Sequence, residues 1–225
     1  MAARVGDLET AGILYGVLTG VVPMRMALQP IVDMRSGRAI GHEALFRVEG
    51  RPGLDPAALW GEASRTGVLE ELEDLTARAC KALLPLDGRL FVNVDPRSTR
   101  IVERWARTPG VVLELTEAAR VPIGLVSALE DAGIPYALDD VGVGEANFAS
   151  LVRMRPQFLK VDRSLVAGCD RDERKAAFLA ALVAYAQRVG VRLIAEGVEA
   201  RGEMALLLRL GVDYGQGFYF GRPVA

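Results

Sequence analysis

The sequence predicts an α/β protein, a closed (β/α)8 barrel. Eight short apolar runs are mostly near-continuous in Val, Ile, Leu and Phe, as expected of strands that are buried on both faces. Helical patterns separate most of these runs, which favours strands with helices between them. The chain has 225 residues, of which 51% are hydrophobic, enough for one barrel of ordinary size. An open doubly wound sheet is the alternative, but no glycine-rich phosphate turn follows the first run.

The individual elements follow from these runs in chain order. Strands are expected at 23–33, 38–49, 89–96, 111–117, 134–140, 157–162, 191–199 and 212–221. Helical patterns lie at 56–65, 69–84, 123–132, 173–188 and 201–210, with shorter or weaker ones at 98–106 and 146–152. Gly133, Gly190 and Gly211 each stand shortly before the next strand, where glycine commonly ends a helix.

Charge, hydropathy and cysteine content indicate which kinds of partner and which cellular compartment to expect. The formal net charge is -2 and no Lys/Arg cluster dominates, which argues against a nucleic-acid polymer. The uncharged stretch 10–24 is short for a membrane span and follows Asp7 and Glu9 rather than basic residues, so we expect a helix at about 7–20 and no membrane span. Cys80 and Cys169 lack a CxxC spacing, which favours buried thiols in the cytoplasm. We expect one domain over 1–225.

Polar residues end six of the apolar runs. These residues are Glu43, Asn93, Glu114, the pair Asp139 and Asp140, Lys160, and Glu196. In a (β/α)8 barrel the strand ends meet on one face, so the acids are expected to form one anionic cup. His42 is the single histidine, so a metal would be held mainly by oxygen, which indicates magnesium or manganese. Alternation along a strand turns His42 away from Glu43, and we expect it to be structural.

Each acid also has a purely structural interpretation. Glu43 could pair with Arg47 on the same face of its strand, and Asp162 could pair with Lys160. The adjacent carboxylates of Asp139 and Asp140 are harder to explain without a cation, because burying unpaired like charges is costly. Taken together, the set favours a functional site.

The motifs resemble those of EAL-domain cyclic di-GMP phosphodiesterases over residues 24–224. The resemblance rests on QPIVDMRSGRAIGHEALFR, FVNVDP, LELTE, ALDDVGVG, LKVDRS, AEGVE and YGQGFYFGRP. It implies a modified (β/α)8 barrel of the TIM type whose first strand runs antiparallel. The stretch DDVGVGEANFAS departs from the family's DDFGTGYSS-like pattern at Val141, Val143, Glu145, Ala146 and Asn147. That departure predicts a poorly anchored loop and slow turnover.

The resemblance also assigns roles to residues. One metal would be held by Glu43, Asn93, Glu114 and Asp139, and the second by Asp139, Asp140 and Glu196. Catalytic roles would fall to Lys160, Glu43 and Glu196. Substrate contacts would be made by Gln29, Leu45, Arg47, Asp162, Gln216 and Pro223. Glu117 would hold the loop after the fifth strand. Two Mg²⁺ or Mn²⁺ ions per site are expected, with Ca²⁺ inhibitory.

The activity implied is hydrolysis of cyclic di-GMP to linear pGpG. The alternative is a receptor that binds the dinucleotide without cleaving it, and a more distant one is a hydrolase of another phosphodiester. A homodimer or a regulatory protein partner is expected in either of the first two cases.

Overall fold

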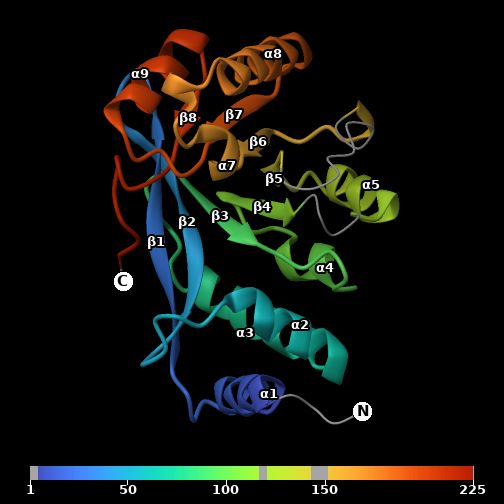
Figure 1. Ribbon diagram of the computed structural model, residues 1–225. Coiled ribbons are helices and arrows are strands. Elements are labelled where there is room, and N and C mark those ends of the chain that lie inside the picture. The colour runs from blue at the N-terminus through green and yellow to red at the C-terminus, as the bar shows by residue number, and fades with distance from the viewer. Residues whose placement is uncertain (1–4, 117–120, 143–151, 225) are drawn as a thin grey trace.

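The eight strands close into a barrel in the order β1 to β8, with β8 returning to β1 (Figure 1). The computed structural model describes residues 5–116, 121–142 and 152–224. The strands are β1 (Met24–Asp33), β2 (Ala39–Val48), β3 (Arg89–Asn93), β4 (Val111–Thr116), β5 (Tyr136–Val141), β6 (Phe158–Val161), β7 (Arg192–Ala195) and β8 (Tyr214–Gly215). All eight expected strands are therefore present, and closure of the sheet excludes the open doubly wound alternative.

The first strand breaks the parallel pattern, as the resemblance implied. β1 runs antiparallel to both β2 and β8, whereas neighbours from β2 to β8 are parallel. The hairpin forms because Asp33 ends β1 and its carboxylate accepts hydrogen bonds from the backbone N–H groups of Arg35 and Ser36. Gly37 then takes φ 70°, a conformation that costs glycine little. β1 and β2 form the longest paired ribbon of the sheet (Figure 1).

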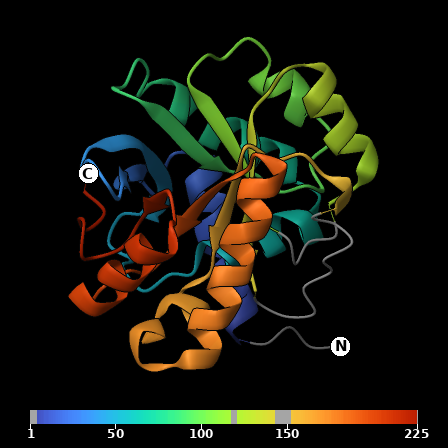
Figure 2. The same cartoon turned by 90° about the horizontal axis from the view of Figure 1, so that it is seen from above.

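The helices lie outside the strands, and Figure 2 shows α5, α8 and α9 in this position. They are α1 (Val5–Leu18), α2 (Pro56–Thr66), α3 (Leu69–Lys81), α4 (Ile101–Trp105), α5 (Ile123–Asp131), α7 (Arg163–Val166), α8 (Glu173–Val189) and α9 (Arg201–Leu210), with a 3-10 turn η2 (Cys169–Arg171). The short α7 and η2 have no counterpart among the expected helices. The pattern at 146–152 lies almost wholly outside the described residues. No helix within the described ranges is long and apolar enough to cross a membrane.

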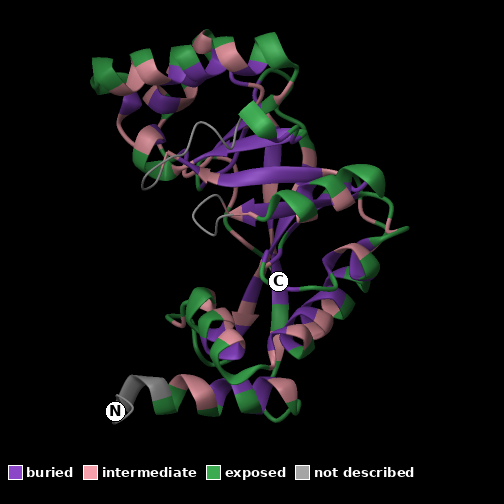
Figure 3. Cartoon of the chain, turned by 90° about the vertical axis from the view of Figure 1, so that its right-hand side faces the viewer, coloured by how far each residue is buried: buried purple, intermediate pink, exposed green. Residues whose placement is uncertain are grey.

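Local sequence explains where the longer helices begin and end. The Asp55 side chain accepts from the Ala57 N–H at the start of α2, and Pro56 occupies the first turn, where its missing N–H has no consequence. Asp172 caps α8 by accepting from two backbone N–H groups. Gly67 and Gly190 end α2 and α8 in the left-handed region. The outer faces of these helices are exposed while the strands are buried (Figure 3).

The barrel interior has an apolar layer directly beneath a polar one. Six buried apolar side chains from six strands form the lower layer: Ile31, Phe91, Val112, Ala137, Phe158 and Ile194. Two positions away on each strand stands a polar residue, because alternate residues of a strand face the same side. With the equivalent positions of β2 and β8, the polar layer consists of Gln29, Glu43, Asn93, Glu114, Asp139, Lys160, Glu196 and Gln216. We call these eight residues the polar ring.

The ring corrects one expectation from the sequence. Glu43, Glu114 and Lys160 do not end their strands but lie within β2, β4 and β6. On β2, the side chains of Ala44, Phe46 and Val48 continue the apolar pattern beyond Glu43. Glu43, Glu114 and Lys160 are consequently buried inside the barrel, above the apolar layer, whereas Asn93 at the end of β3 is exposed.

Candidate active site

Lys160 lies at the centre of the polar ring and is only 1% exposed. Its Nζ atom is 2.7 Å from Glu114 Oε1, 2.9 Å from Glu196 Oε1, 3.2 Å from Asp139 Oδ2 and 3.6 Å from Glu43 Oε2. These partners come from β2, β4, β5 and the residue after β7. The structure therefore brings together acids that are far apart in the chain, as expected, but around an ammonium group.

The acids set the charge state of this lysine. Burial by itself lowers the pKa of Lys160, but the negative charges of Asp139, Glu114, Glu196 and Glu43 outweigh it and raise that pKa well above its ordinary value. Burial raises the pKa of Glu43, but the charge of Lys160 and the hydrogen bonds from Gln216 and Asn93 lower it by more, so the net shift is downward. The centre of the ring thus holds an ammonium ion facing at least one firmly ionised carboxylate.

Two other carboxyls of the ring take up protons easily. Burial, followed by repulsion from Glu43, raises the pKa of Glu114 well above its ordinary value. Burial and repulsion from Asp139 and Glu43 raise the pKa of Glu196 to about 8, although Lys160 opposes the shift. Glu114 Oε2 is buried and accepts no hydrogen bond from the described residues. The single positive charge of Lys160 does not balance the charge of the four carboxylates around it.

A backbone bulge places two carboxylates side by side at the end of β5. The register between β5 and β6 shifts between Leu138 and Val141, and Asp140 has φ 59°, which is uncommon for a residue with a side chain. Oxygen atoms of Asp139, Asp140 and Glu196 lie within 4.8 Å of one another. Burial and the neighbouring Asp139 charge raise the pKa of Asp140.

This donor set fits hard divalent cations. Carboxylate and amide oxygens are the ligands that Mg²⁺ and Mn²⁺ prefer, and the ring supplies them from seven strands or strand ends. The unsatisfied oxygen of Glu114 and the raised pKa values are what is expected where a cation would compensate buried negative charge.

Hydrogen bonds orient Glu43 from β3 on one side and from β1 and the end of β8 on the other. Asn93 Nδ2 donates to Glu43 Oε1 at 2.8 Å, and Gln216 Nε2 donates to Glu43 Oε2 at 2.5 Å. Gln216 Nε2 also donates to Gln29 Oε1, and Gln29 Nε2 donates to the carbonyl oxygen of Gly221. Gln216 Oε1 is buried without a partner in the described chain. These four contacts fix the carboxylate of Glu43 and leave acceptor capacity in the ring.

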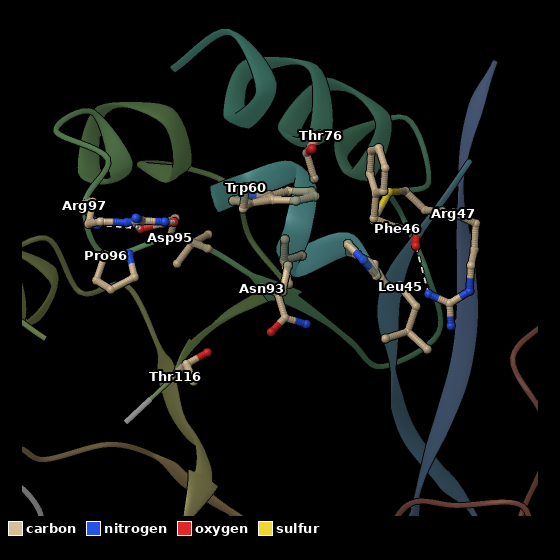
Figure 4. A pocket seen from close by; sticks show the side chains of 16 residues that line it. Leu45, Phe46, Arg47, Trp60, Thr76, Asn93, Asp95, Pro96, Arg97 and Thr116 are labelled. Carbon is tan, nitrogen blue, oxygen red and sulfur yellow. Dashed lines mark hydrogen bonds and ion pairs between the residues drawn. The ribbon is translucent and has the colours of Figure 1, made fainter. Parts of the chain in front are cut away.

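A pocket of about 530 Å³ opens beside the ring, between β2, β3, α2 and α3. Leu45 and Arg47 line it from β2, Asn93 from β3 and Trp60 from α2 (Figure 4). Arg47 donates to the Phe46 carbonyl oxygen at 2.8 Å, so it makes no ion pair with Glu43. The structural interpretation of Glu43 as the partner of Arg47 is therefore wrong.

The remaining expected contacts lie at different places. Asp162 caps α7 by accepting from the Ser164 N–H, and it is not among the acids that pair with Lys160. Pro223 lies between Gly221 and Val224, which bond to β1 through Gln29 and Leu28. Glu117 lies outside the described residues, as does the altered loop after Gly142. The Nδ1 atom of His42 is buried and has no partner in the described part of the chain.

Sequence reasoning missed the outer wall of the pocket. The Trp60 indole N–H donates to Glu73 Oε1 at 2.6 Å, and the Asp95 backbone N–H donates to the same oxygen. Arg97 pairs with Asp95 and lines the pocket (Figure 4). A charged residue at a core position of α3 was the available signal, since buried acids are rare. Its link to the loop after β3 depends on tertiary packing.

Glu73 gives the protein a testable pH dependence. It is 2% exposed, and burial raises its pKa to about 7 from 4.5. Glu73 therefore ionises at a lower pH in the unfolded chain than in the folded protein. This difference lowers the free energy of unfolding by about 3 kcal/mol by pH 8. Glu73→Gln should be more stable, relative to wild type, at pH 8 than at pH 4.5 by about that amount, measured by urea unfolding. The exposed Glu71→Gln on the same helix is the control, and equal pH profiles for wild type and Glu73→Gln would contradict the prediction.

Comparisons with known proteins agree with this geometry. A family model described as EAL domain matches residues 23–223. The bifunctional diguanylate cyclase/cyclic di-GMP phosphodiesterase MucR of Pseudomonas aeruginosa is 30% identical over 221 residues, covering 87% of this chain and 32% of that protein. The probable cyclic di-GMP phosphodiesterase PdeD of Escherichia coli is 32% identical over 216 residues, covering 87% of this chain and 41% of that protein.

Solved structures give the same answer for the fold. The MucR phosphodiesterase in its c-di-GMP complex has a TM-score of 0.82 at 26% identity, covering 96% of this chain and 97% of that one. An EAL domain protein from Listeria monocytogenes has a TM-score of 0.81 at 21% identity, which shows a shared fold. The chain spans about a third to two fifths of the curated relatives it matches. With the family match covering nearly all of its length, the chain belongs to the EAL domain family.

Proposed function

We propose that this protein is a metal-dependent phosphodiesterase that hydrolyses cyclic di-GMP to linear pGpG. The observation that carries the proposal is the polar ring: four carboxylates within 3.6 Å of the Lys160 ammonium, with Asn93 completing the set. This ring is continuous with a pocket that Asn93, Leu45 and Arg47 line. The names of MucR and PdeD support cyclic di-GMP as the substrate.

We assign two cation positions within the ring. Glu43, Asn93, Glu114 and Asp139 would hold one, and Asp139, Asp140 and Glu196 the other. Two bound Mg²⁺ or Mn²⁺ ions would supply an activated water and neutralise the charge that develops on the phosphate. Asp139 stands between the two sets, and its Oδ1 accepts the Asp140 backbone N–H at 2.9 Å, which fixes the bulge that aims both carboxylates.

The other residues of the site bind and orient. The four carboxylates that pair with Lys160 are the proposed ligands of the cations. With cations bound to them, the Lys160 ammonium group would contact a substrate phosphate oxygen instead. Arg47 offers a guanidinium at the pocket wall, suited to a phosphate. The proposed substrate contacts are completed by Leu45, Asp162, Gln29, Gln216 and Pro223. We propose that Glu117 holds the loop after the fifth strand.

A receptor that binds cyclic di-GMP without cleaving it is the second candidate. The observation that favours it is the set of ion pairs around Lys160, which compete with any cation for the same oxygens. Conversely, all six proposed ligand residues are present, and this supports the enzyme.

Incubation with cyclic di-GMP distinguishes the two functions. With Mg²⁺ or Mn²⁺, chromatography should reveal pGpG, whereas Ca²⁺ should inhibit because its bonds are longer and its geometry looser. Excess EDTA should abolish product formation, and restored Mg²⁺ should recover it. Tight binding with no product in the presence of either metal would favour the receptor, and an undiminished rate after verified metal removal would exclude the two-metal mechanism.

Partners and compartment are further parts of the proposal. The buried free thiols of Cys80 and Cys169 suit the reducing cytoplasm. We expect regulation through a homodimer or a regulatory protein partner.

A further inference from the structure

The β1–β2 ribbon extends beyond the polar ring, and the residues on the same face of the ribbon as Gln29 and Glu43 continue along it. Gln29 pairs with Glu43, Ala27 with Leu45, and Arg25 with Arg47. Residues directly opposite on antiparallel strands, and every second residue along them, share one face. Arg25 and Arg47 are therefore neighbours on the face that begins at the polar ring, and both line a second pocket at this end of the ribbon.

Arg25 and Arg47 stand directly opposite each other in the β1–β2 register, and neither is ion-paired with an acid among the described residues. Arg47 has one hydrogen bond, to the backbone oxygen of Phe46, and Arg25 makes neither an ion pair nor a side-chain hydrogen bond in the described part of the chain. Glu49 lines the same pocket but is not ion-paired with either arginine. Like charges directly opposite on a ladder destabilise the sheet, so this arrangement costs the free protein stability and suits an anion placed between them.

We propose that Arg25 joins Arg47 in a clamp for the phosphodiester that is not cleaved. The inference rests on the proposed function and extends it to a residue outside the ring. A cyclic dinucleotide carries two phosphodiesters on opposite sides of one ring, so when one lies at the polar ring the other projects away from it. The ribbon rises roughly 3.4 Å per residue, and four residues separate Glu43 from Arg47, about 14 Å at the backbone. Long arginine side chains reach back across part of that distance, and Arg47 lines both pockets.

Two guanidinium groups bind one phosphate well because each offers a planar pair of N–H donors to its oxygens. The clamp would discriminate between dinucleotides by phosphate number: cyclic di-GMP has two phosphodiesters, whereas linear GpG has the same two bases and only one. Arg25 should therefore matter for the cyclic substrate and not for GpG.

The test measures KM for cyclic di-GMP and the inhibition constant of GpG for Arg25→Met, Arg25→Lys and Arg38→Met. Arg38 lies exposed at the other end of the same hairpin, and its replacement removes an equal charge. Arg25→Met should raise KM about 10-fold, with little change in kcat and in the GpG constant. Arg25→Lys should fall between Arg25→Met and wild type, and Arg38→Met should match wild type.

Stability provides an independent readout. Because Arg25→Met relieves repulsion, its thermal midpoint should equal or exceed that of wild type. Equal effects of Arg25→Met and Arg38→Met, or equal weakening of cyclic di-GMP and GpG, would overturn the clamp. If the wild type yields no pGpG, the proposed function fails separately. Calorimetric binding of the same two nucleotides then decides the clamp.

Discussion

Replacing Glu43 with alanine is expected to lower the rate of cyclic di-GMP cleavage by roughly 1,000-fold or more, equivalent to about 4 kcal/mol of transition-state stabilisation. Glu43 is a proposed cation ligand, and its two carboxylate oxygens also accept from Asn93 and Gln216. Its loss removes a proposed ligand and the acceptor of the Asn93 amide, and leaves the Gln216 amide with Gln29 as its acceptor. The pocket lined by Leu45 and Arg47 remains, so weak binding of the dinucleotide should persist.

Steady-state kinetics with Mg²⁺ and calorimetric binding of cyclic di-GMP measure the two effects of Glu43→Ala separately. Glu71→Ala, exposed on α3 and away from both pockets, is the control and should retain the wild-type rate. Glu43→Gln keeps the side-chain volume and serves if the alanine variant fails to fold. A rate within a factor of ten of wild type for folded Glu43→Gln or Glu43→Ala would remove Glu43 from the reaction.

Replacing Lys160 with methionine is expected to destabilise the metal-free protein by about 3 kcal/mol at pH 8, because it leaves buried carboxylates without their cation. The loss should shrink at pH 5, where carboxyls such as Glu196, with a pKa already raised to about 8, take up protons instead. Mg²⁺ should restore stability, and by more in Lys160→Met than in wild type, because the metal no longer competes with an ammonium group for the same oxygens.

Thermal unfolding of Lys160→Met across an Mg²⁺ titration at both pH values checks this expectation, together with product formation at saturating Mg²⁺. Stability should be recovered while cleavage stays at least 100-fold below wild type, because Lys160 is a proposed catalytic group. Lys175→Met is a control that removes a lysine whose side chain, among the described residues, bonds to the backbone oxygens of Ser164 and Ala167. If Mg²⁺ raises the midpoint of wild type and Lys160→Met equally, Lys160 and the cation do not share a site.

Most of the fold was predictable because its signals are local. Buried strands read as apolar runs, and Asp55, Gly67, Asp172 and Gly190 mark helix ends through bonds to their immediate neighbours. The short α7 gave no such signal, because Asp162 caps only four residues. The antiparallel direction of β1 followed from the family resemblance, since strand direction cannot be inferred from an apolar run.

Much of the candidate site was also predictable, but its internal arrangement was not. The residue types at Glu43, Asp139 and Glu196, each following an apolar run, were sufficient to indicate an oxygen-rich site. The capture of Lys160 by four acids depends on distances between β2, β4, β5 and β7, and no local pattern encodes those distances. The Trp60–Glu73–Asp95 wall is hidden for the same reason, because its members belong to α2, α3 and the loop after β3.

The sequence by itself determined which residue types alternate along each strand, and therefore that one polar side chain stands two positions from an apolar one on strand after strand. Only closure of the barrel decided that the polar residues of different strands lie at the same height along the barrel axis. The register of each strand is set by its neighbours and by the bulge at Asp139 and Asp140. That register brings eight separate polar residues into one ring above the apolar layer, where burial strengthens the electrostatic interactions between them. It also places Arg25 opposite Arg47, a pairing between residues on different strands that cannot be inferred from either strand alone.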